Sequence, residues 1–245
     1  MKFALITGAN KGIGFETAKQ LLQKGFYVYL GSRELKNGVQ AVERLKSDNL
    51  TDVTAVQLDV TDDYSVKTAH EEISRNSEVL DVLVNNAGIN GGSPYTALEA
   101  TTDQFNTAFN TNVIGVSRVT QVFMDLLRKS PAPRIVNVST SVGSLTLQSD
   151  TNWPAYEYGK YAVYAASKAA LNMYTVHLAY ELRATAFKVN AVCPGYTKTD
   201  FTNYTGGEVE LAGKRILKYA LIDQDGPSGK FFSEETNPET GHIPW

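Results

Sequence analysis

Short apolar runs alternate with longer stretches of mixed apolar and polar residues along most of the chain. The short runs, such as residues 3–6 and 134–138, are typical of strands buried on both faces of a sheet. The longer stretches are typical of helices, and one of them begins at the capping residues Thr61 and Asp62. The pattern predicts strands over 3–6, 27–30, 53–58, 79–84, 134–138 and 187–192, and helices ending near 24, beginning near 63, and spanning 35–47, 101–129 and 162–184.

This order of elements predicts the fold class. Strands separated by helices of about ten residues or more indicate βαβ units and a parallel sheet. Right-handed crossovers then give an α/β fold, a Rossmann-type doubly wound parallel sheet with helices on both faces. At 245 residues the chain fits a single domain, residues 1–245. The pattern is lost over 200–228, which we predict to be an irregular substrate loop with a short helix.

The composition excludes several classes of protein. A net charge of −3 provides no basic surface for nucleic acid, and no apolar stretch is long enough to cross a membrane. The first apolar run leads directly into a glycine-rich loop, so no cleaved signal peptide is expected. The single cysteine, Cys193, favours the reducing cytoplasm. His70, His177 and His242 do not have a metal-ligand spacing, so no metal is expected.

The glycine-rich loop after the first strand has the sequence Thr7-Gly8-Ala9-Asn10-Lys11-Gly12-Ile13-Gly14. In a doubly wound sheet, Gly8 allows the turn, Gly12 lets the backbone approach a pyrophosphate, and Gly14 lets helix and strand pack closely. The phosphates would bind at the N-terminus of the helix, whose N–H groups attract negative charge. Three glycines also occur in ordinary turns, but their place in a βαβ chain favours a dinucleotide-binding loop.

The end of the second strand indicates which dinucleotide binds, because the adenosine ribose is recognised about 20 residues after the glycines. Ser32 and Arg33 lie there, rather than an acidic residue. An acid would repel a 2′-phosphate, whereas a guanidinium forms charge-assisted hydrogen bonds with it. Lys11 adds a second cation in the glycine loop. Unless these are two solvated surface charges, they predict NADP(H) rather than NAD(H).

Tyr164 and Lys168 are four residues apart, which places both side chains on one face of a helix. A phenol has a pKa of about 10, and a nearby cation lowers it by stabilising the phenolate. Tyr156 and Lys160 have the same spacing, but Gly159 disfavours a helix there, whereas the alanines after Tyr164 favour one. Tyr164 is therefore the better candidate for transferring a proton.

Together these residues resemble the classical short-chain dehydrogenase/reductase family. The resemblance covers residues 3 to about 200, and the whole set of motifs is specific although each one alone is not. The matching segments are the glycine loop, Asp59-Val60, Asn85-Asn86-Ala87-Gly88, Asn112, residues 134–143, Tyr164-x-x-x-Lys168 and Pro194-Gly195. Lys11 beside Gly12 and the sequence of residues 225–232 resemble NADPH-dependent carbonyl reductases in particular.

The resemblance implies that Tyr164 is the general acid in carbonyl reduction, or the base in alcohol oxidation. Lys168 would lower the pKa of Tyr164 and bind the nicotinamide ribose, and Asn112 would hold a water in a proton relay. The implied cofactor contacts come from Gly8, Asn10, Lys11, Gly12, Ile13, Gly14, Ser32, Arg33, Asp59 and Val60 (adenine), Asn86, Ala87 and Gly88 (inner ribose), Tyr164, Lys168, Pro194, Gly195, and Thr197 and Thr199 (nicotinamide and phosphates).

The chain departs from the family pattern at the hydroxyl that binds the substrate oxygen. The family has a serine three residues before a glycine, and counting back from Gly143 gives Thr140. Threonine offers the same hydroxyl, but its β-branch restricts χ1 and adds a methyl group. Ser139 or Ser141 would take the role if the register differed by one residue. A shift of one residue on a strand turns the side chain to the other face, which favours Thr140.

The sequence thus predicts a cytoplasmic NADPH-dependent reductase of a small, moderately apolar ketone or aldehyde. Residues 145–160 and 200–220 would cover the substrate with Trp153, Tyr156, Tyr158, Phe201 and Tyr204. Two alternatives remain open: an NADP-linked alcohol dehydrogenase working in the oxidative direction, and a weakly catalytic NADPH-binding sensor, favoured only by Thr140. Family members usually pair through long helices, so a homodimer is favoured, although insertions before the catalytic tyrosine accompany monomers in some carbonyl reductases.

Overall fold

The computed structural model describes residues 1–245 and contains one seven-stranded sheet. All neighbouring strands are parallel, in the order β3-β2-β1-β4-β5-β6-β7. The strands are β1 Lys2–Ile6, β2 Phe26–Ser32, β3 Val53–Gln57, β4 Val82–Asn85, β5 Arg134–Val138, β6 Lys188–Val192 and β7 Phe231–Phe232. The predicted α/β fold is confirmed. The strand order reverses between β1 and β4, where the carboxyl ends of such a sheet form a ligand-binding crevice.

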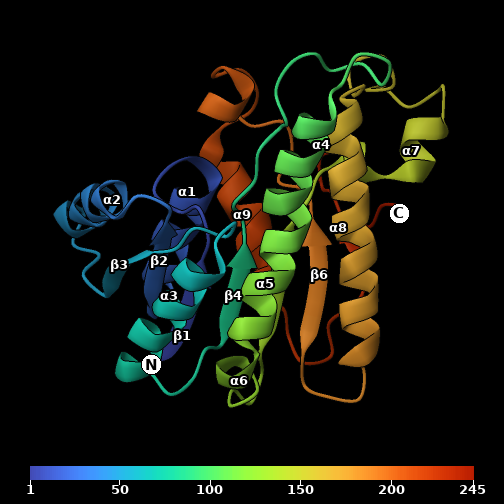
Figure 1. Ribbon diagram of the computed structural model, residues 1–245. Coiled ribbons are helices and arrows are strands. Elements are labelled where there is room, and N and C mark those ends of the chain that lie inside the picture. The colour runs from blue at the N-terminus through green and yellow to red at the C-terminus, as the bar shows by residue number, and fades with distance from the viewer.

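Helices cover both faces of the sheet, with α5 and α8 in front of it and α9 behind it in Figure 1. The helices are α1 Gly12–Gln23, α2 Leu35–Ser47, α3 Asp63–Asn76, α4 Thr102–Phe109, α5 Gly115–Val122, α6 Met124–Leu127, α7 Leu145–Ser149, α8 Ala162–Glu181 and α9 Val209–Ala220. None of them combines the length and the apolar character needed to cross a bilayer.

Two apolar clusters, one on each face, hold the helices to the sheet. Buried residues of α1, α2 and α9 belong to one cluster, and those of α3, α5, α6 and α8 belong to the other. Along β1, Ala4 and Ile6 lie in the first cluster and Leu5 lies in the second. Successive strand side chains point to opposite faces, so a strand that is covered on both sides is apolar at most of its positions.

Several predicted boundaries were wrong: α8 ends at Glu181 rather than at residue 184, and β2 ends at Ser32 rather than at residue 30. The helix predicted over 101–129 is interrupted by a π-helical turn, Asn110–Ile114, and its last segment ends at Leu127. β4 begins at Val82 rather than at residue 79, because the preceding residues form the connection from α3. In that connection the Leu80 amide donates to the Leu126 carbonyl of α6, and the sheet is reached at Asp81, whose amide donates to the Phe3 carbonyl of β1.

The segment 200–228 is more ordered than predicted. It contains α9, an amphipathic helix of 12 residues whose buried positions include Ala212, Ile216 and Tyr219. Gly206 and Gly207, which lie just before this helix, made the segment resemble a loop. β7 was not predicted at all, because a strand of two residues is too short to show a period.

Candidate active site

The conformation of the glycine loop between β1 and α1 requires glycine at three positions. Gly8 and Gly12 have φ angles of +62° and +57°, in the left-handed region that other residues disfavour. A Cβ on Gly14 would lie 2.5 Å from the Asn86 side-chain nitrogen and 2.8 Å from the Gly8 carbonyl oxygen. The loop can therefore turn sharply and pack against the end of β4.

The N-terminus of α1 has the properties of an anion-binding site. No side chain caps this helix, and its first turn contains no acidic residue. Asn10 and Ile13 lie partly exposed in the same loop. The unpaired N–H groups and the positive end of the helix dipole favour a phosphate here.

Two cations lie near this loop, in different environments. Arg33 follows β2, is exposed, and has no hydrogen-bond or ion-pair partner in the protein. The hydroxyl of the buried Ser32 donates to the Glu34 carbonyl at 2.9 Å, so it is already engaged. Lys11, also exposed, forms an ion pair with Asp200. The sequence did not predict this pair, which joins the glycine loop to the predicted substrate loop.

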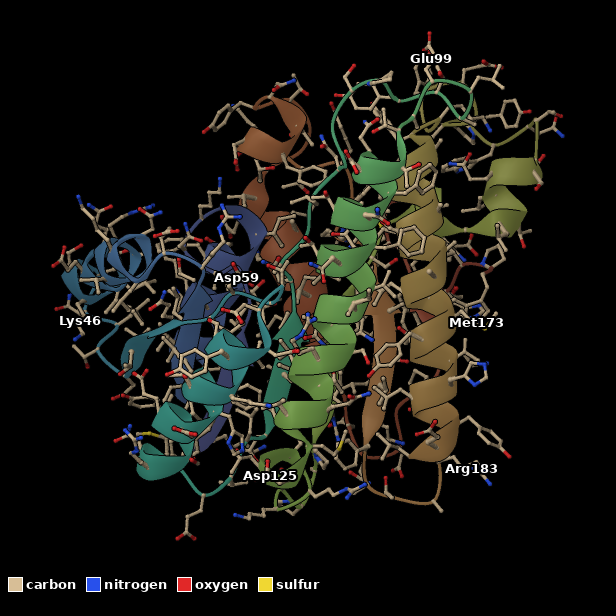
Figure 2. All side chains as sticks on the ribbon, in the orientation of Figure 1. Lys46, Asp59, Glu99, Asp125, Met173 and Arg183 are labelled. Atoms are coloured by element: carbon tan, nitrogen blue, oxygen red, sulfur yellow. The ribbon has the colours of Figure 1, made fainter.

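The ends of β3 and β4 contribute the next residues. Asp59 is labelled in Figure 2, and its Oδ1 accepts from the Thr61 N–H at 2.9 Å and hydroxyl at 2.7 Å. The Val60 side chain is buried. After β4, the Thr7 hydroxyl accepts from the N–H groups of Asn86 and Ala87, both at 3.0 Å. Thr7 thereby ties the end of β4 to the glycine loop, a role that the sequence reading missed although Thr7 stands in the motif.

Tyr164 and Lys168 lie on α8, with the Lys168 Nζ 5.9 Å from the centroid of the Tyr164 ring. Nζ also donates to the Val138 carbonyl at 2.7 Å. Burial lowers the pKa of Lys168 to about 8, against a smaller opposing effect of Cys193. Burial, with a smaller effect of Cys193 in the same direction, raises the pKa of Tyr164. We expected Lys168 to lower the Tyr164 pKa, but desolvation dominates in this structure.

Asn112 lies in the π-helical turn, fully buried, and its side chain is entirely used by the protein. Oδ1 accepts from the Ile89 N–H at 2.9 Å, and Nδ2 donates to the Ile89 carbonyl at 2.8 Å and the Ser167 hydroxyl at 2.9 Å. A Cβ on Gly88 would lie 3.3 Å from Asn112 Oδ1 and 3.5 Å from Lys168 Nζ. The side chains of Asn112 and Lys168 therefore both lie next to Gly88. Turns of this π-helical type are frequent at functional sites.

The turn after β5 distinguishes Ser139 from the other two candidate hydroxyls, Thr140 and Ser141, which are both partly exposed. The Ser141 hydroxyl makes no hydrogen bond in the protein, so only the sequence register favours Thr140 over it. Ser139 is buried, and its Oγ donates to Asn172 Oδ1 at 2.7 Å. Thr140 is partly exposed and precedes the 3-10 turn Ser141–Gly143, and its Oγ1 accepts only a weak 3.4 Å bond from Val142. The Ser139 hydroxyl is thus engaged with α8, while the Thr140 hydroxyl retains capacity to bind a substrate.

The competing pair, Tyr156 and Lys160, lies in turns rather than in a helix. Lys160 Nζ lies 3.6 Å from the centroid of the Tyr156 ring and donates to the main-chain and side-chain oxygens of Gln148, both at 3.0 Å. The predicted absence of a helix at Gly159 is confirmed. Lys160 therefore anchors its loop to α7.

The segment after β6 closes the other side of the site. Gly195 follows Pro194 with a φ of +91°, and Thr197 and Thr199 are buried. Thr199 approaches the glycine loop, where a Cβ on Gly12 would lie 3.4 Å from its methyl carbon. The Phe201 ring lies 5.4 Å from the Tyr164 ring, between centroids. An aromatic side chain of the predicted substrate loop therefore lies against the candidate acid.

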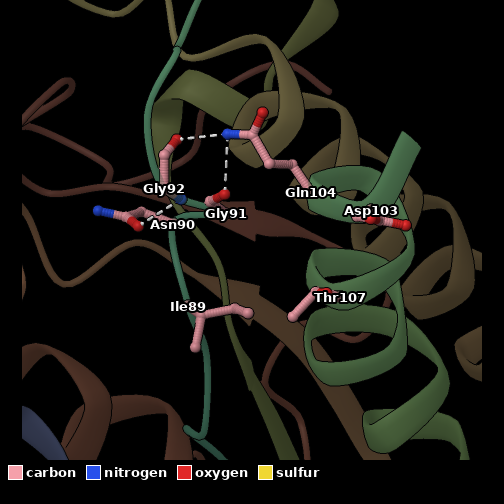
Figure 3. Close-up of a pocket in the computed structure, with 7 residues that line it drawn as sticks. All are labelled: Ile89, Asn90, Gly91, Gly92, Asp103, Gln104 and Thr107. Atoms are coloured by element: carbon pink, nitrogen blue, oxygen red, sulfur yellow. Dashed lines mark hydrogen bonds between the residues drawn. The ribbon is translucent and has the colours of Figure 1, made fainter. Parts of the chain in front are cut away.

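A cavity of about 400 Å³ lies beside this site, between the loop after β4 and α4 (Figure 3). Only one hydrophobic residue is among those that line it, which are Ile89, Asn90, Gly91, Gly92, Asp103, Gln104 and Thr107. Gln104 Nε2 donates to the carbonyls of Gly91 at 3.0 Å and Gly92 at 2.9 Å, which fixes the loop. Neither Tyr164 nor Lys168 lines it, so we do not assign the cavity to the reaction. No cluster of three or more metal-ligating side chains occurs in the structure.

A doubly wound sheet with a glycine loop at its first helix and a Tyr–Lys pair on a later helix defines a nicotinamide-dinucleotide-dependent oxidoreductase. Residues 2–209 match the family model described as short chain dehydrogenase. The protein belongs to this family, as the sequence resemblance predicted.

The chain is also similar to individual named relatives and to solved structures. The chain is 33% identical to (+)-neomenthol dehydrogenase from Capsicum annuum, covering 94% of this chain and 95% of that protein. It is 35% identical to salutaridine reductase from Papaver bracteatum, over 95% and 94%. The structure of salutaridine reductase from Papaver somniferum matches with a TM-score of 0.83 at 34% identity, over 95% and 100%. An NADPH-bound carbonyl reductase from chicken fatty liver matches with a TM-score of 0.84 at 26% identity, over 100% and 99%.

Proposed function

We propose that the protein reduces the carbonyl group of a small, moderately apolar ketone or aldehyde to an alcohol, with NADP(H) as cofactor. The observation that carries this proposal is that Lys168 and Asn112 meet at Gly88, after β4, with the Tyr164 ring 5.9 Å from Lys168 Nζ. β4 pairs with β1, the strand that leads into the glycine loop. A partly exposed tyrosine near a buried lysine, beside a dinucleotide crevice, suits a reaction that needs one hydride and one proton.

The residues present fit NADP(H). The left-handed glycines and the uncapped N-terminus of α1 leave room and N–H groups for the pyrophosphate. Arg33 has no partner in the protein, so it is free to bind a 2′-phosphate. Lys11 can do the same by exchanging Asp200 for a phosphate. The remaining contacts would come from Ser32, Asp59, Val60, Asn86, Ala87, Gly88, Pro194, Gly195, Thr197 and Thr199.

Bound NADPH would supply the hydride, and the side chains of this chain would manage the proton. Because burial raises the Tyr164 pKa, the phenol is protonated at neutral pH and can donate to the oxygen of the reduced carbonyl. Lys168, with a pKa of about 8, is mostly charged at pH 7 and would stabilise the phenolate that remains. The Thr140 hydroxyl would hold the substrate oxygen. Because the Asn112 side chain is fully engaged, a water relay would use its main-chain oxygen.

The substrate class rests on the aromatic side chains and on the relatives. Phe201 lies against Tyr164 and offers an apolar surface beside the acid. Two relatives are named for the reduction of salutaridine and the dehydrogenation of (+)-neomenthol, which supports a small organic carbonyl or alcohol as the substrate here. The reverse reaction, oxidation of an alcohol with NADP, uses the same groups with Tyr164 as base.

We further propose that residues 1–245 form a single domain and act in the cytoplasm as a homodimer. The outer side of α8 exposes Met173, labelled in Figure 2, and Tyr180, at 59% and 62%. Ile114, the last residue of the π-helical turn before α5, is 50% exposed. Pairing through these helices would cover the three apolar side chains.

The function is tested by NADPH consumption against a panel of ketones and aldehydes, with Tyr164→Phe as the decisive variant. Phenylalanine keeps the ring but has no proton to donate, so kcat should fall about a hundredfold or more, with NADPH affinity nearly unchanged. Tyr156→Phe is the matched control and should retain activity. A fully active Tyr164→Phe, or an inactive Tyr156→Phe, would contradict the assignment. NADPH binding without turnover of any carbonyl or alcohol would favour the sensor alternative.

A further inference from the structure

The turn that carries Thr140 is attached to the catalytic helix at both of its ends by one side chain, Asn172. Its Oδ1 accepts from the Ser139 hydroxyl at 2.7 Å, just before Thr140. Its Nδ2 donates to the Gly143 carbonyl at 3.1 Å, where the turn ends. Asn172 and Ser139 are 3% and 2% exposed, so neither bond competes with water.

Asn172 occupies a specific place relative to the candidate acid. It follows Lys168 by four residues and Tyr164 by eight on α8, so the three side chains share one side of the helix. At the other end of the turn, a Cβ on Gly143 would lie 2.9 Å from Lys168 Cβ. The turn and the helix are therefore in direct contact, and the Asn172 amide fixes how they are aligned.

We propose that Asn172 is a positioning residue for the reaction: it fixes the Thr140 hydroxyl relative to Tyr164. This inference rests on the proposed function, in which both groups act on one substrate oxygen. A hydroxyl that stabilises developing charge must lie about 2.7–3.1 Å from that oxygen, and a displacement of about 1 Å can cost a hundredfold in rate. Without Asn172, the nearest bond from α8 is that of Lys168 Nζ to the Val138 carbonyl, one residue before Ser139, and no side chain of α8 bonds to Gly143.

If Asn172 only stabilised the fold, its loss would lower the melting temperature without lowering kcat. Asn190 provides the matched control for such a structural role. Its buried amide likewise donates one hydrogen bond and accepts another, donating to the Pro227 carbonyl at 2.9 Å and accepting from the Lys230 N–H at 3.1 Å. Asn190 lies on β6 and does not contact the Thr140 turn. Asn190→Ala should therefore lower the melting temperature while leaving kcat of the folded protein within about twofold.

The test is a double-mutant cycle on kcat and KM, with melting temperature and NADPH Kd measured beside it. Asn172→Ala should lower kcat about tenfold or more in the wild-type background, with NADPH Kd unchanged. In a Thr140→Val background the same change should lower kcat less than about twofold, because there is no hydroxyl left to misplace. Ser139→Ala, which removes one of the two bonds, should show the same dependence on Thr140 to a smaller extent, and it serves if Asn172→Ala fails to fold.

The outcomes separate the inference from the function on which it rests. An equal loss of kcat in both backgrounds, or no loss in either, overturns the positioning role of Asn172 alone. Full activity in Thr140→Val overturns the role of Thr140 and with it this inference. Inactivity of the wild type toward every carbonyl and alcohol tested overturns the proposed function itself.

Discussion

Because the charge on Lys168 is buried, the free energy of unfolding of this protein should rise between about pH 8 and pH 10, and Lys168→Met should abolish this rise. The residue is 4% exposed, and burial lowers its pKa from the ordinary value of 10.5 to about 8. In the unfolded chain the same amine titrates near its ordinary pKa. Between these two values the unfolded state binds more protons than the folded state, so the free energy of unfolding must rise with pH. Below about pH 8 both states are charged, and the cost of burying the charge is constant.

The magnitude follows from the two pKa values. At about 1.4 kcal/mol per pKa unit, the full shift corresponds to about 3 kcal/mol, of which about 2 kcal/mol is regained between pH 8 and pH 10. Lys168→Met keeps a side chain of similar length without the charge and should lack this gain. Burial raises the pKa values of Tyr29, Tyr164 and Tyr219, so these tyrosines change the free energy of unfolding mainly above about pH 10. They are present in both proteins, so their contribution cancels when the wild type is compared with Lys168→Met.

The assay is urea unfolding of the wild type and of Lys168→Met at several pH values between 7 and 10. The wild type should gain about 2 kcal/mol relative to the variant over this range. Lys214→Met is the control. Lys214 is exposed, so the free energy of unfolding of this variant should depend on pH as that of the wild type does. A constant difference between wild type and Lys168→Met from pH 7 to pH 10 would refute the reasoning and show that Lys168 titrates normally in the folded protein.

Three further predictions concern the cofactor site. Arg33→Asp should shift the ratio of NADPH to NADH Kd values by at least about tenfold toward NADH, since an acid repels the 2′-phosphate; equal Kd values in the wild type would exclude this selectivity. Asp200→Asn should tighten NADPH binding measured by calorimetry, because it frees Lys11 from its ion pair, and unchanged affinity would mean that Lys11 does not reach the cofactor. Gly14→Ala should lower both melting temperature and NADPH affinity, because the new Cβ meets Asn86 at 2.5 Å; wild-type values of both would show that the loop can adjust.

The sequence determined the features that are encoded locally. Apolar runs and helical stretches alternate, and this pattern predicted six of the seven strands and the parallel sheet. The prediction succeeded because a strand covered on both faces is apolar at most of its positions, whatever its partners are. The same holds for the left-handed glycines Gly8 and Gly12 and for the Tyr164–Lys168 spacing, since turn geometry and helical periodicity need only a few neighbouring residues.

Only the tertiary structure decided which distant side chains meet. Lys11 pairs with Asp200, 189 residues later, and Ser139 bonds to Asn172, 33 residues later. Neither contact has a signal in the sequence, because the sheet order and the helix packing bring these segments together. The pKa of Tyr164 shows the same limit: proximity to Lys168 predicted a lower value, but burial, which depends on every element packed around the ring, raises it. A residue's type and spacing establish which chemistry it can perform, and its surroundings establish its protonation state and its partners.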